Sequence, residues 1–515
     1  MKMGGRSRLR ALRQTCSVVL PATLPSFLER ASGRSMVAKC DQPRHKGLRG
    51  AKWLLVFGAK VAVSPCAAGA QVSTNLERAP TLTIERYSED WSGLADSANR
   101  TGLWTEPFKY IPLNDDGTVY LTTGLEARSR YEGYENVNWG SSPDDDYVWH
   151  RLMPYADLHV GKVRFFAQPI LSAITGTDRP KRPVDSTGAD MLQAFVDVDI
   201  PVSGGASLRL SAGRKLVSLG GGRFIDTRYG PGVPLPFDGF EVILTGKTRM
   251  ITGFYLEPVD TGLGDFNDRR SRNKAVWGVY ATQWLGGSHL NGFDVYYIGL
   301  RDRNALFDQG AGREVAHTFG ARVFGDHGAW YWNAEAALQY GTFSGHRVEA
   351  WGVGAETGYR FRNVPLRPEI SLTSDIVSGD GDPNDSKLGT LNPLFPKGKY
   401  FGSLTPVGPR NLIHLRPSTA IHPHKDVALS LTGVAYWRES THDGIYAIPG
   451  LLVRSGKSSN ARFIGKQIEL AISWQATREL NLTGSLSAFD PGPFIRDTGP
   501  ARTIKMVGAQ STFRF

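Results

Sequence analysis

The residues best suited to chemistry in this sequence are arginines that recur inside alternating stretches. In TVYLTTGLEARSRY (residues 118–131), Arg128 and Arg130 share one face with Glu126, while Leu125 lies on the opposite face. A guanidinium group offers a planar fork of donors that can bind a carboxylate or a sulfate through two parallel hydrogen bonds. A surface lined with such groups would bind anionic molecules.

Other arginines share this setting, either on the charged face of an alternating run or in a glycine-rich motif between two runs. The alternation places Arg128, Arg130, Arg151, Arg209, Arg249, Arg322, Arg416 and Arg514 on the charged face, and the motif holds Arg214, Arg223 and Arg228. One interpretation is that they line a pore and that the motif arginines form its constriction. The alternative is that they pair with acids on the same face, such as Glu126, Asp157, Asp197, Asp199, Glu241, Glu369 and Asp375, and only brace a wall.

The overall charge does not decide between these roles, because its excess lies in the leader. The chain has 515 residues and a net charge of +11, but the first 70 residues hold 13 of the 60 Lys and Arg residues and two of the 49 acids. The other residues therefore balance at 47 bases and 47 acids, which argues against nucleic-acid binding. All three cysteines, Cys16, Cys40 and Cys66, also lie in the first 70 residues, so the rest of the chain has no thiol chemistry.

The leader resembles a secretory signal. Lys46, Arg49 and Lys52 precede a short apolar run at residues 53–63, and Ala68-Gly69-Ala70 fits the small-x-small cleavage rule. We therefore expect residues 1–70 to be a leader and signal peptide, with residues 1–35 a misassigned start. Residues 71–117 are irregular and are expected to form a periplasmic N-terminal segment.

From residue 118 to residue 515 the sequence alternates apolar and polar residues in runs of about ten, the length of a tilted strand that crosses a bilayer. Aromatic residues such as Trp284, Tyr297 and Trp437 stand at run ends, where the girdles of a membrane barrel belong. We count 18 runs, which start near residues 118, 147, 162, 189, 206, 237, 248, 274, 290, 313, 328, 346, 366, 410, 426, 461, 480 and 503. The pattern predicts an all-β fold, a transmembrane antiparallel β-barrel of 18 strands, with 16 or 20 as alternatives. Long loops are expected at residues 214–236, 258–273, 378–409 and 439–460.

The last run, KMVGAQSTFRF, alternates to its final residue. We expect it to close the barrel by pairing near residues 118–131, because an open edge in lipid leaves main-chain groups without partners. Phe513 and Phe515 are predicted to point to lipid and to act as the signal read by the barrel-insertion machinery, and Arg514 is predicted to face the lumen.

Three stretches carry a family resemblance. They are FKYIPLNDDGTVYLTTGLEARSRYE (residues 108–132), GRKLVSLGGGRFIDTRYGPGVPLPFDGFEV (residues 213–242) and SGDGDPNDSKLGTLNPLFPKGKYFG (residues 378–402). Together they resemble the alginate export family of outer-membrane barrels. The resemblance implies an 18-stranded barrel in the bacterial outer membrane with an arginine-lined lumen.

The function that the resemblance implies is passive passage of an anionic solute, above all export of an acidic polysaccharide such as alginate. Fixed positive charge spread over several weak sites would favour entry of such a solute into the pore and still let it leave. The expected partners are the solute, outer-membrane lipid, the insertion machinery and a periplasmic export scaffold, without a cofactor. A general or small-anion porin and a barrel enzyme remain alternatives, although no GxSxG or HExxH motif is present and no serine is singled out as a partner for His150, His159, His317 or His414.

Metal binding has weak support in the sequence. Asp380, Asp382 and Asn384 stand at alternate positions like the ligands of a calcium loop, but Asp385 and Leu391 occupy the places where that loop has glycine and glutamate. A polar turn is the better interpretation.

Overall fold

The computed structural model describes residues 80–515, and most of that chain is β-strand. The predicted leader, its cleavage site and residues 71–79 lie outside the described residues. The long strands are β2 (Val119–Glu135), β3 (Asp145–Val160), β4 (Val163–Thr175), β5 (Gly188–Val202), β6 (Ala206–Lys215), β7 (Phe237–Thr245), β8 (Arg249–Asp260), β10 (Lys274–Trp284), β11 (Gly292–Phe307), β12 (Gly310–Asp326), β13 (Trp330–Phe343), β14 (His346–Arg360), β15 (Glu369–Val377), β17 (Leu412–His424), β18 (Val427–Trp437), β21 (Phe463–Gln475), β22 (Leu480–Pro491) and β23 (Ile504–Arg514).

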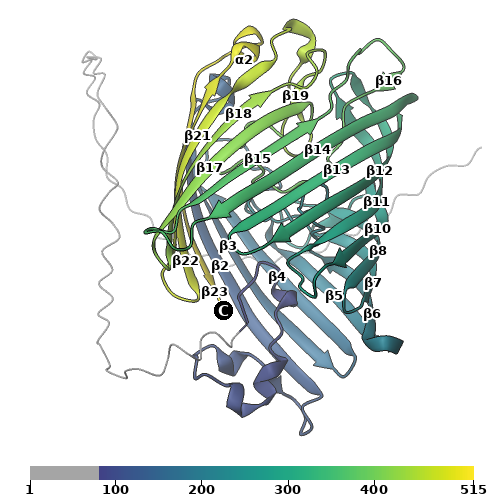
Figure 1. Cartoon of the computed structure of the whole chain (residues 1–515), viewed down its shortest axis with the longest axis vertical. Coiled ribbons are helices and arrows are strands. Elements are labelled where there is room, and N and C mark those ends of the chain that lie inside the picture. The colour runs from purple at the N-terminus through teal and green to yellow at the C-terminus, as the bar shows by residue number, and fades with distance from the viewer. Residues whose placement is uncertain (1–79) are drawn as a thin grey trace, which may run out of the picture. The chain divides into compact units, whose positions relative to one another are not determined.

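These strands form one closed antiparallel barrel (Figure 1). Each long strand pairs with the next, and β23 returns to pair with β2, from Lys505 opposite Glu135 to Arg514 opposite Glu126. The prediction of an 18-stranded transmembrane barrel is confirmed. Every predicted run starts within three residues of the observed strand.

The two faces of the wall have inverted polarity compared with a water-soluble protein. Outward-facing Leu338, Leu431 and Leu486 are exposed, whereas inward-facing Gln193 and Gln339 are fully buried. A chain folded in water exposes its polar groups and buries its large apolar side chains. The observed pattern is that of a wall surrounded by lipid.

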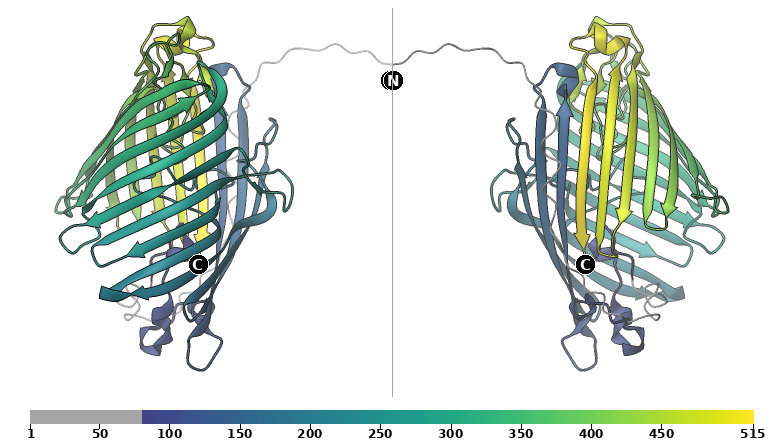
Figure 2. Two further views of the ribbon diagram at one scale, coloured as in Figure 1. Left: turned by 90° about the vertical axis from the view of Figure 1, so that its right-hand side faces the viewer. Right: turned by 90° about the vertical axis from the view of Figure 1, so that its left-hand side faces the viewer.

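The connections at the two ends of the barrel differ in length (Figure 2). At one end, β2 begins, β23 ends and the turns are short, for example residues 161–162, 246–248 and 425–426. Outer-membrane barrels keep short turns in the periplasm, so we assign this end to the periplasmic side. At the other end, the connections at residues 216–236, 261–273, 378–411 and 438–462 are long and match the predicted loops.

None of the helices among residues 80–515 is long and apolar enough to cross a membrane. Short elements lie before β2 and in the connections between the long strands. They are η2 (Arg86–Ser88), η3 (Ser92–Ala95), η4 (Ser97–Asn99), η5 (Glu106–Phe108), β1 (Ile111–Pro112), α1 (Val137–Gly140), η6 (Ser203–Gly205), β9 (Arg269–Arg270), β16 (Lys387–Leu388), β19 (Ile445–Tyr446), β20 (Leu452–Arg454), η7 (Gly456–Ser458) and α2 (Pro493–Asp497).

The closing seam differs in register from the sequence-based expectation. β23 pairs with the second part of β2, up to Glu126, and Phe515 continues the pairing with two main-chain hydrogen bonds to Leu125. The first part of β2 extends beyond the end of β23, and there β1 pairs with Tyr120 and Leu121 instead. The chain thus covers the strand edge that the stagger of the barrel leaves unpaired.

Candidate functional site

The loop between β6 and β7, residues 216–236, crosses the lumen. On one wall, Arg128 of β2 and Arg151 of β3 donate hydrogen bonds to the main-chain oxygens of Tyr229 and Pro231. Arg130 of β2 donates to the oxygen of Gly230, at 3.1 Å. Three buried arginines therefore hold the far part of this loop against the wall by its carbonyl groups.

The near part of the same loop reaches a distant wall. Arg223 lies 3.3 Å from a carboxylate oxygen of Glu335 on β13 and 3.3 Å from one of Asp375 on β15. In the order of strands around the barrel, β13 and β15 stand roughly opposite β2 and β3. The loop is consequently fixed at two sides of the lumen, by hydrogen bonds from arginines to its carbonyl groups on one side and by the ion pairs of Arg223 on the other.

A second loop, residues 378–411 between β15 and β17, joins the first inside the barrel. Ile225 and Phe395 form a parallel bridge, and the amide of Asp226 donates to the oxygen of Phe395 at 2.9 Å. The amide of Lys397 donates to the oxygen of Gly222 at 3.0 Å. We call this paired unit, residues 222–231 together with 393–400, the constriction.

One side of the constriction is apolar and rests on the wall. Phe224, Ile225, Leu394 and Phe395 are buried in one cluster with inward-facing residues of β8 and β10–β14, such as Phe254. The ring of Phe395 meets the ring of Phe237 edge-on, with centroids 5.3 Å apart. Burial of this area, at about 25 cal/mol per Å² of apolar surface, explains why the two loops stay folded inward.

The other side of the constriction carries positive charge. Within residues 80–515, the four cations Arg228, Lys397, Lys399 and Arg416 have no carboxylate oxygen within 4.0 Å. Arg228 donates to the oxygen of Pro396 at 3.2 Å, and Arg416 projects from β17. Burial lowers the pKa of the Lys397 ammonium, and the nearby Arg223 and Arg416 lower it further. These cations make no direct ion pair, although Asp375 acts on Lys397 and Glu132 acts on Lys399 from a greater distance.

Several of the predicted pore-lining arginines also face inward but are neutralised. Arg209 lies 2.7 Å from Asp199, and Arg322 lies 2.6 Å from Asp294. Arg151 and Arg514 both bind the fully buried Glu126, each at 2.7 Å. Arg130 pairs with Glu132. In these pairs the arginines brace the wall, which is the alternative role weighed above.

Two of the predicted pore-lining residues do not face the lumen. Arg249 lies on the side of β8 that carries the exposed Ile251, next to a turn, because the inward-facing positions of that strand are Thr252, Phe254 and Leu256. Arg214 is opposite Asp238 on the outward side of β6 and β7, and bridges to it at 2.7 Å. The inward placement of Arg249 and the assignment of Arg214 to the constriction are therefore corrected.

The remaining predicted sites lie near the two ends of the barrel. Asp380 accepts hydrogen bonds from the amide of Gly389 and from Gln309, and Asp382 accepts one from the amide of Asn384, so the candidate calcium ligands stabilise a turn. Among the described residues no group of three or more His, Cys, Asp or Glu side chains is arranged for a metal. The Phe513 ring stacks on that of Trp104 at a centroid distance of 6.3 Å, and the Phe515 ring meets it at a tilt, 5.3 Å away.

Sequence reasoning missed Lys397 and Lys399, although both stand in the quoted motif NPLFPKGKYFG. It also missed Tyr229, whose ring lies 4.1 Å from the Arg151 guanidinium and whose hydroxyl donates to Glu126. The motif itself was the only available signal. Arg151 and Glu126, the partners of Tyr229, lie more than 70 positions away in sequence, so no local pattern could identify them.

The sequence profile of the alginate export family matches residues 119–509, nearly the whole barrel. The chain belongs to the alginate export family. As a member of this family with a porin fold, it is a channel of the bacterial outer membrane and not an enzyme. No curated protein matches the chain in sequence.

Solved structures similar to this alginate export family member are outer-membrane porins of Pseudomonas aeruginosa. OccK2 in complex with glucuronate is 11% identical, with a TM-score of 0.51 and coverage of 77% of this chain and 98% of that chain. OpdK with vanillate is 10% identical, with a TM-score of 0.51 and the same coverage of both chains. At this level of identity the likeness shows a shared fold.

Proposed function

We propose that this channel passes anionic solutes and that the positive surface of the constriction selects them. The observation that carries the proposal is the set Arg228, Lys397, Lys399 and Arg416, which lies on the two inward-folded loops and on β17 and makes no ion pair within 4.0 Å. Fixed charge of one sign in a narrow, low-dielectric passage focuses the field and raises the local concentration of counter-ions. Separate cations let an anion move from one weak site to the next.

The solute class that we favour is an acidic saccharide. The family is described by alginate export, and one porin of similar fold was crystallised with glucuronate, a sugar carboxylate. A uronate carries one carboxylate per sugar, which a lysine ammonium or an arginine fork can bind. In this proposal, the channel exports an acidic polysaccharide down its concentration gradient.

A small-anion porin is the second candidate, and the crowding of the lumen favours it. Two loops meet inside the barrel, and both are packed into buried apolar clusters with the wall. A monomeric acid needs only a narrow gap, whereas a polymer needs a continuous passage past both loops. The vanillate-bound relative also holds a small aromatic acid.

Planar-bilayer recordings in a KCl gradient test the anion preference. The reversal potential of the wild type is expected to indicate preference for chloride. The triple variant Lys397→Gln, Lys399→Gln, Arg416→Gln is expected to lose several-fold in the anion-to-cation permeability ratio. A wild-type channel that prefers cations, or a triple variant with unchanged selectivity, would contradict the proposal.

A matched control removes the same charge elsewhere. Lys162, Lys247 and Lys425 lie exposed in short turns at the periplasmic end, so their triple replacement by glutamine is expected to leave the selectivity unchanged. Efflux of glucuronate, uronate oligomers and polymeric alginate from liposomes then separates the two solute classes. Efflux of monomers only would assign the small-anion function, and efflux of polymer would assign export.

A further inference from the structure

Residues 80–110 enter the periplasmic end of the barrel and contact its inner wall (Figure 1). The segment consists of four short 3-10 turns, η2–η5, and has no long element of its own. Its side chains reach inward-facing residues on β3, β4 and β6 and the chain end after β23. The contacts of Tyr87 and Arg86 show how it is held.

Tyr87 inserts its ring between inward-facing aromatic residues. The ring meets Phe166 of β4 edge-on at 6.0 Å and Phe195 of β5 edge-on at 5.5 Å. The Lys215 ammonium of β6 lies 4.8 Å from the ring centroid, and Arg164 of β4 donates a hydrogen bond to the main-chain oxygen of Tyr87 at 2.6 Å. Tyr87 is therefore anchored on the lumen side of three neighbouring strands.

The same side chain contacts the start of the loop at residues 216–236, which carries part of the constriction and is called the constriction loop below. The Tyr87 hydroxyl donates a hydrogen bond to the main-chain oxygen of Leu216, at 2.9 Å. Leu216 is the first residue after β6 and is fully buried. The periplasmic segment and the loop that crosses the lumen are thus in direct contact.

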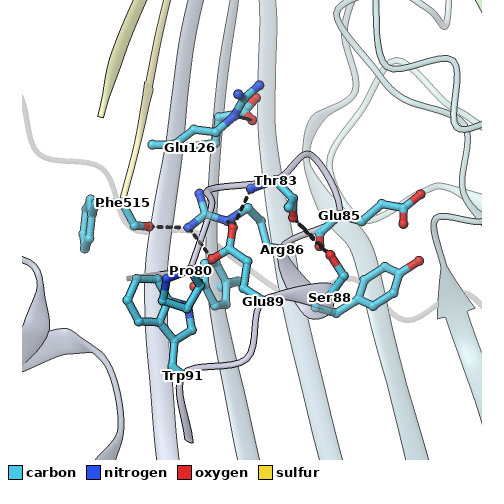
Figure 3. Close-up of polar contacts among 12 residues, drawn as sticks. Pro80, Thr83, Glu85, Arg86, Ser88, Glu89, Trp91, Glu126 and Phe515 are labelled. Atoms are coloured by element: carbon cyan, nitrogen blue, oxygen red, sulfur yellow. Dashed lines mark hydrogen bonds and ion pairs between the residues drawn. The ribbon is translucent and has the colours of Figure 1, made fainter. Parts of the chain in front are cut away.

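Arg86 holds the segment at a second point, and its bonding is incomplete (Figure 3). It pairs with Glu89 at 2.9 Å and donates to the main-chain oxygen of Phe515 at 2.8 Å. The side chain is buried, and its Nε atom is the one that lies 2.9 Å from Glu89, whereas its Nη1 atom makes no hydrogen bond with any residue of the described chain. A buried donor without an acceptor costs free energy, so the Nη1 atom lowers the net stabilisation that Arg86 gives to the docked segment.

We propose that residues 80–110 form a plug at the periplasmic mouth, which is released to open the channel, and that Tyr87 and Arg86 are its two holding points. Release of Tyr87 frees the aromatic pocket on β4 and β5 and removes the hydrogen bond to the constriction loop. The segment thereby controls how far the periplasmic mouth is open. The plug requires a conducting channel but does not depend on which ions it prefers.

Single-channel recordings of the full chain test the plug. Tyr87→Ala is expected to raise the mean conductance or the open fraction several-fold, with the wild-type reversal potential retained. Ser92→Ala, an exposed position in the same segment, is the control and is expected to match the wild type. Wild-type conductance and open fraction in Tyr87→Ala would overturn the plug. A wild-type reversal potential that indicates cation preference would contradict only the selectivity proposal.

Tyr87→Phe keeps the ring and removes only the hydroxyl, so it decides the question if the alanine variant fails to assemble. Loss of one hydrogen bond, about 1 kcal/mol, corresponds to roughly a fivefold rise in the ratio of open to closed channels. An unchanged ratio in assembled Tyr87→Phe would refute the role of the Leu216 contact and with it the coupling of plug and constriction.

Discussion

Removal of Phe515 is expected to open the seam of the barrel at its periplasmic end. The amide of Phe515 donates to the oxygen of Leu125 at 3.0 Å, and the amide of Leu125 donates back at 3.1 Å. Arg86 donates to the same main-chain oxygen of Phe515. The ring lies 5.3 Å from that of Trp104 and 5.5 Å from that of Phe108. One residue therefore connects β2, the chain end and the periplasmic segment.

The expected loss of unfolding free energy follows from these contacts, and two variants separate the share of the ring from that of the main chain. Phe515→Ala loses three aromatic pairs, those with Trp104, Phe108 and Phe513, worth about 0.5–1.5 kcal/mol each, and is expected to lower the free energy of unfolding by at least roughly 2 kcal/mol. Deletion of Phe515 also loses two main-chain hydrogen bonds at about 1 kcal/mol each and a charge-assisted one at about 2 kcal/mol. The deletion is thus expected to cost on the order of 6 kcal/mol.

Urea unfolding in detergent micelles measures these differences, and heat-modifiable migration on gels measures assembly in the outer membrane. The deletion is expected to assemble poorly while still being secreted, and Phe515→Ala is expected to be intermediate. If the deleted protein assembles and unfolds like the wild type, the seam does not depend on this residue. Equal losses in both variants would instead assign the whole effect to the ring, in keeping with an insertion signal at Phe513 and Phe515.

Three further predictions concern buried charge and metal. Burial lowers the pKa of Lys109 to about 7, with Arg86 adding to the effect while Glu89 opposes it. Because the folded-state pKa is below the usual 10.5, protonation opposes folding. The free energy of unfolding in urea is therefore expected to rise by roughly 2 kcal/mol from pH 7 to pH 9, and Lys109→Met is expected to abolish this rise. Glu126→Gln leaves the buried Arg151 and the partly exposed Arg514 without a carboxylate and is expected to cost about 3 kcal/mol in urea unfolding. Glu257→Gln, which breaks only a 3.6 Å pair with the exposed Arg270, is expected to cost under about 0.5 kcal/mol. EDTA is expected to leave the melting temperature unchanged, because the acids of the 380–385 turn are already hydrogen-bonded; a drop that calcium restores would reinstate the metal site.

The alternation of the sequence was sufficient to predict the barrel because each strand needs only a two-residue period and a lipid-facing side. The same reasoning places Arg128, Arg151 and Arg322 inward, as the structure does. It fails at the strand ends. Arg249 follows a turn, where the side of the strand on which a residue falls cannot be counted from its neighbours. Arg214 is a different case, because its place in the constriction was inferred from the motif, and it lies opposite Asp238 on the outer side.

The constriction could not be predicted from the sequence in the same way. Its loops have no period, and their course depends on contacts such as Arg223 with Asp375, which are 152 positions apart. Glycine and proline in the motifs indicate turns but not the direction in which a loop folds. Only long-range pairing brings Lys397 beside Arg223 and Arg416, and only that pairing distinguishes a free cation from a braced one.

The hydrogen bond between Arg86 and Phe515 joins residues 429 positions apart, which constrains the order of folding. The N-terminal partner is synthesised first but cannot make this contact until the last residue has arrived. Contacts of such long sequence separation form late, because the entropy of closing the loop must be overcome before they contribute. The segment at residues 80–110 can therefore make this contact only after all the strands of the barrel have been inserted. Its docking would mark the end of assembly, and resistance of this segment to protease added during refolding would report when the barrel has closed.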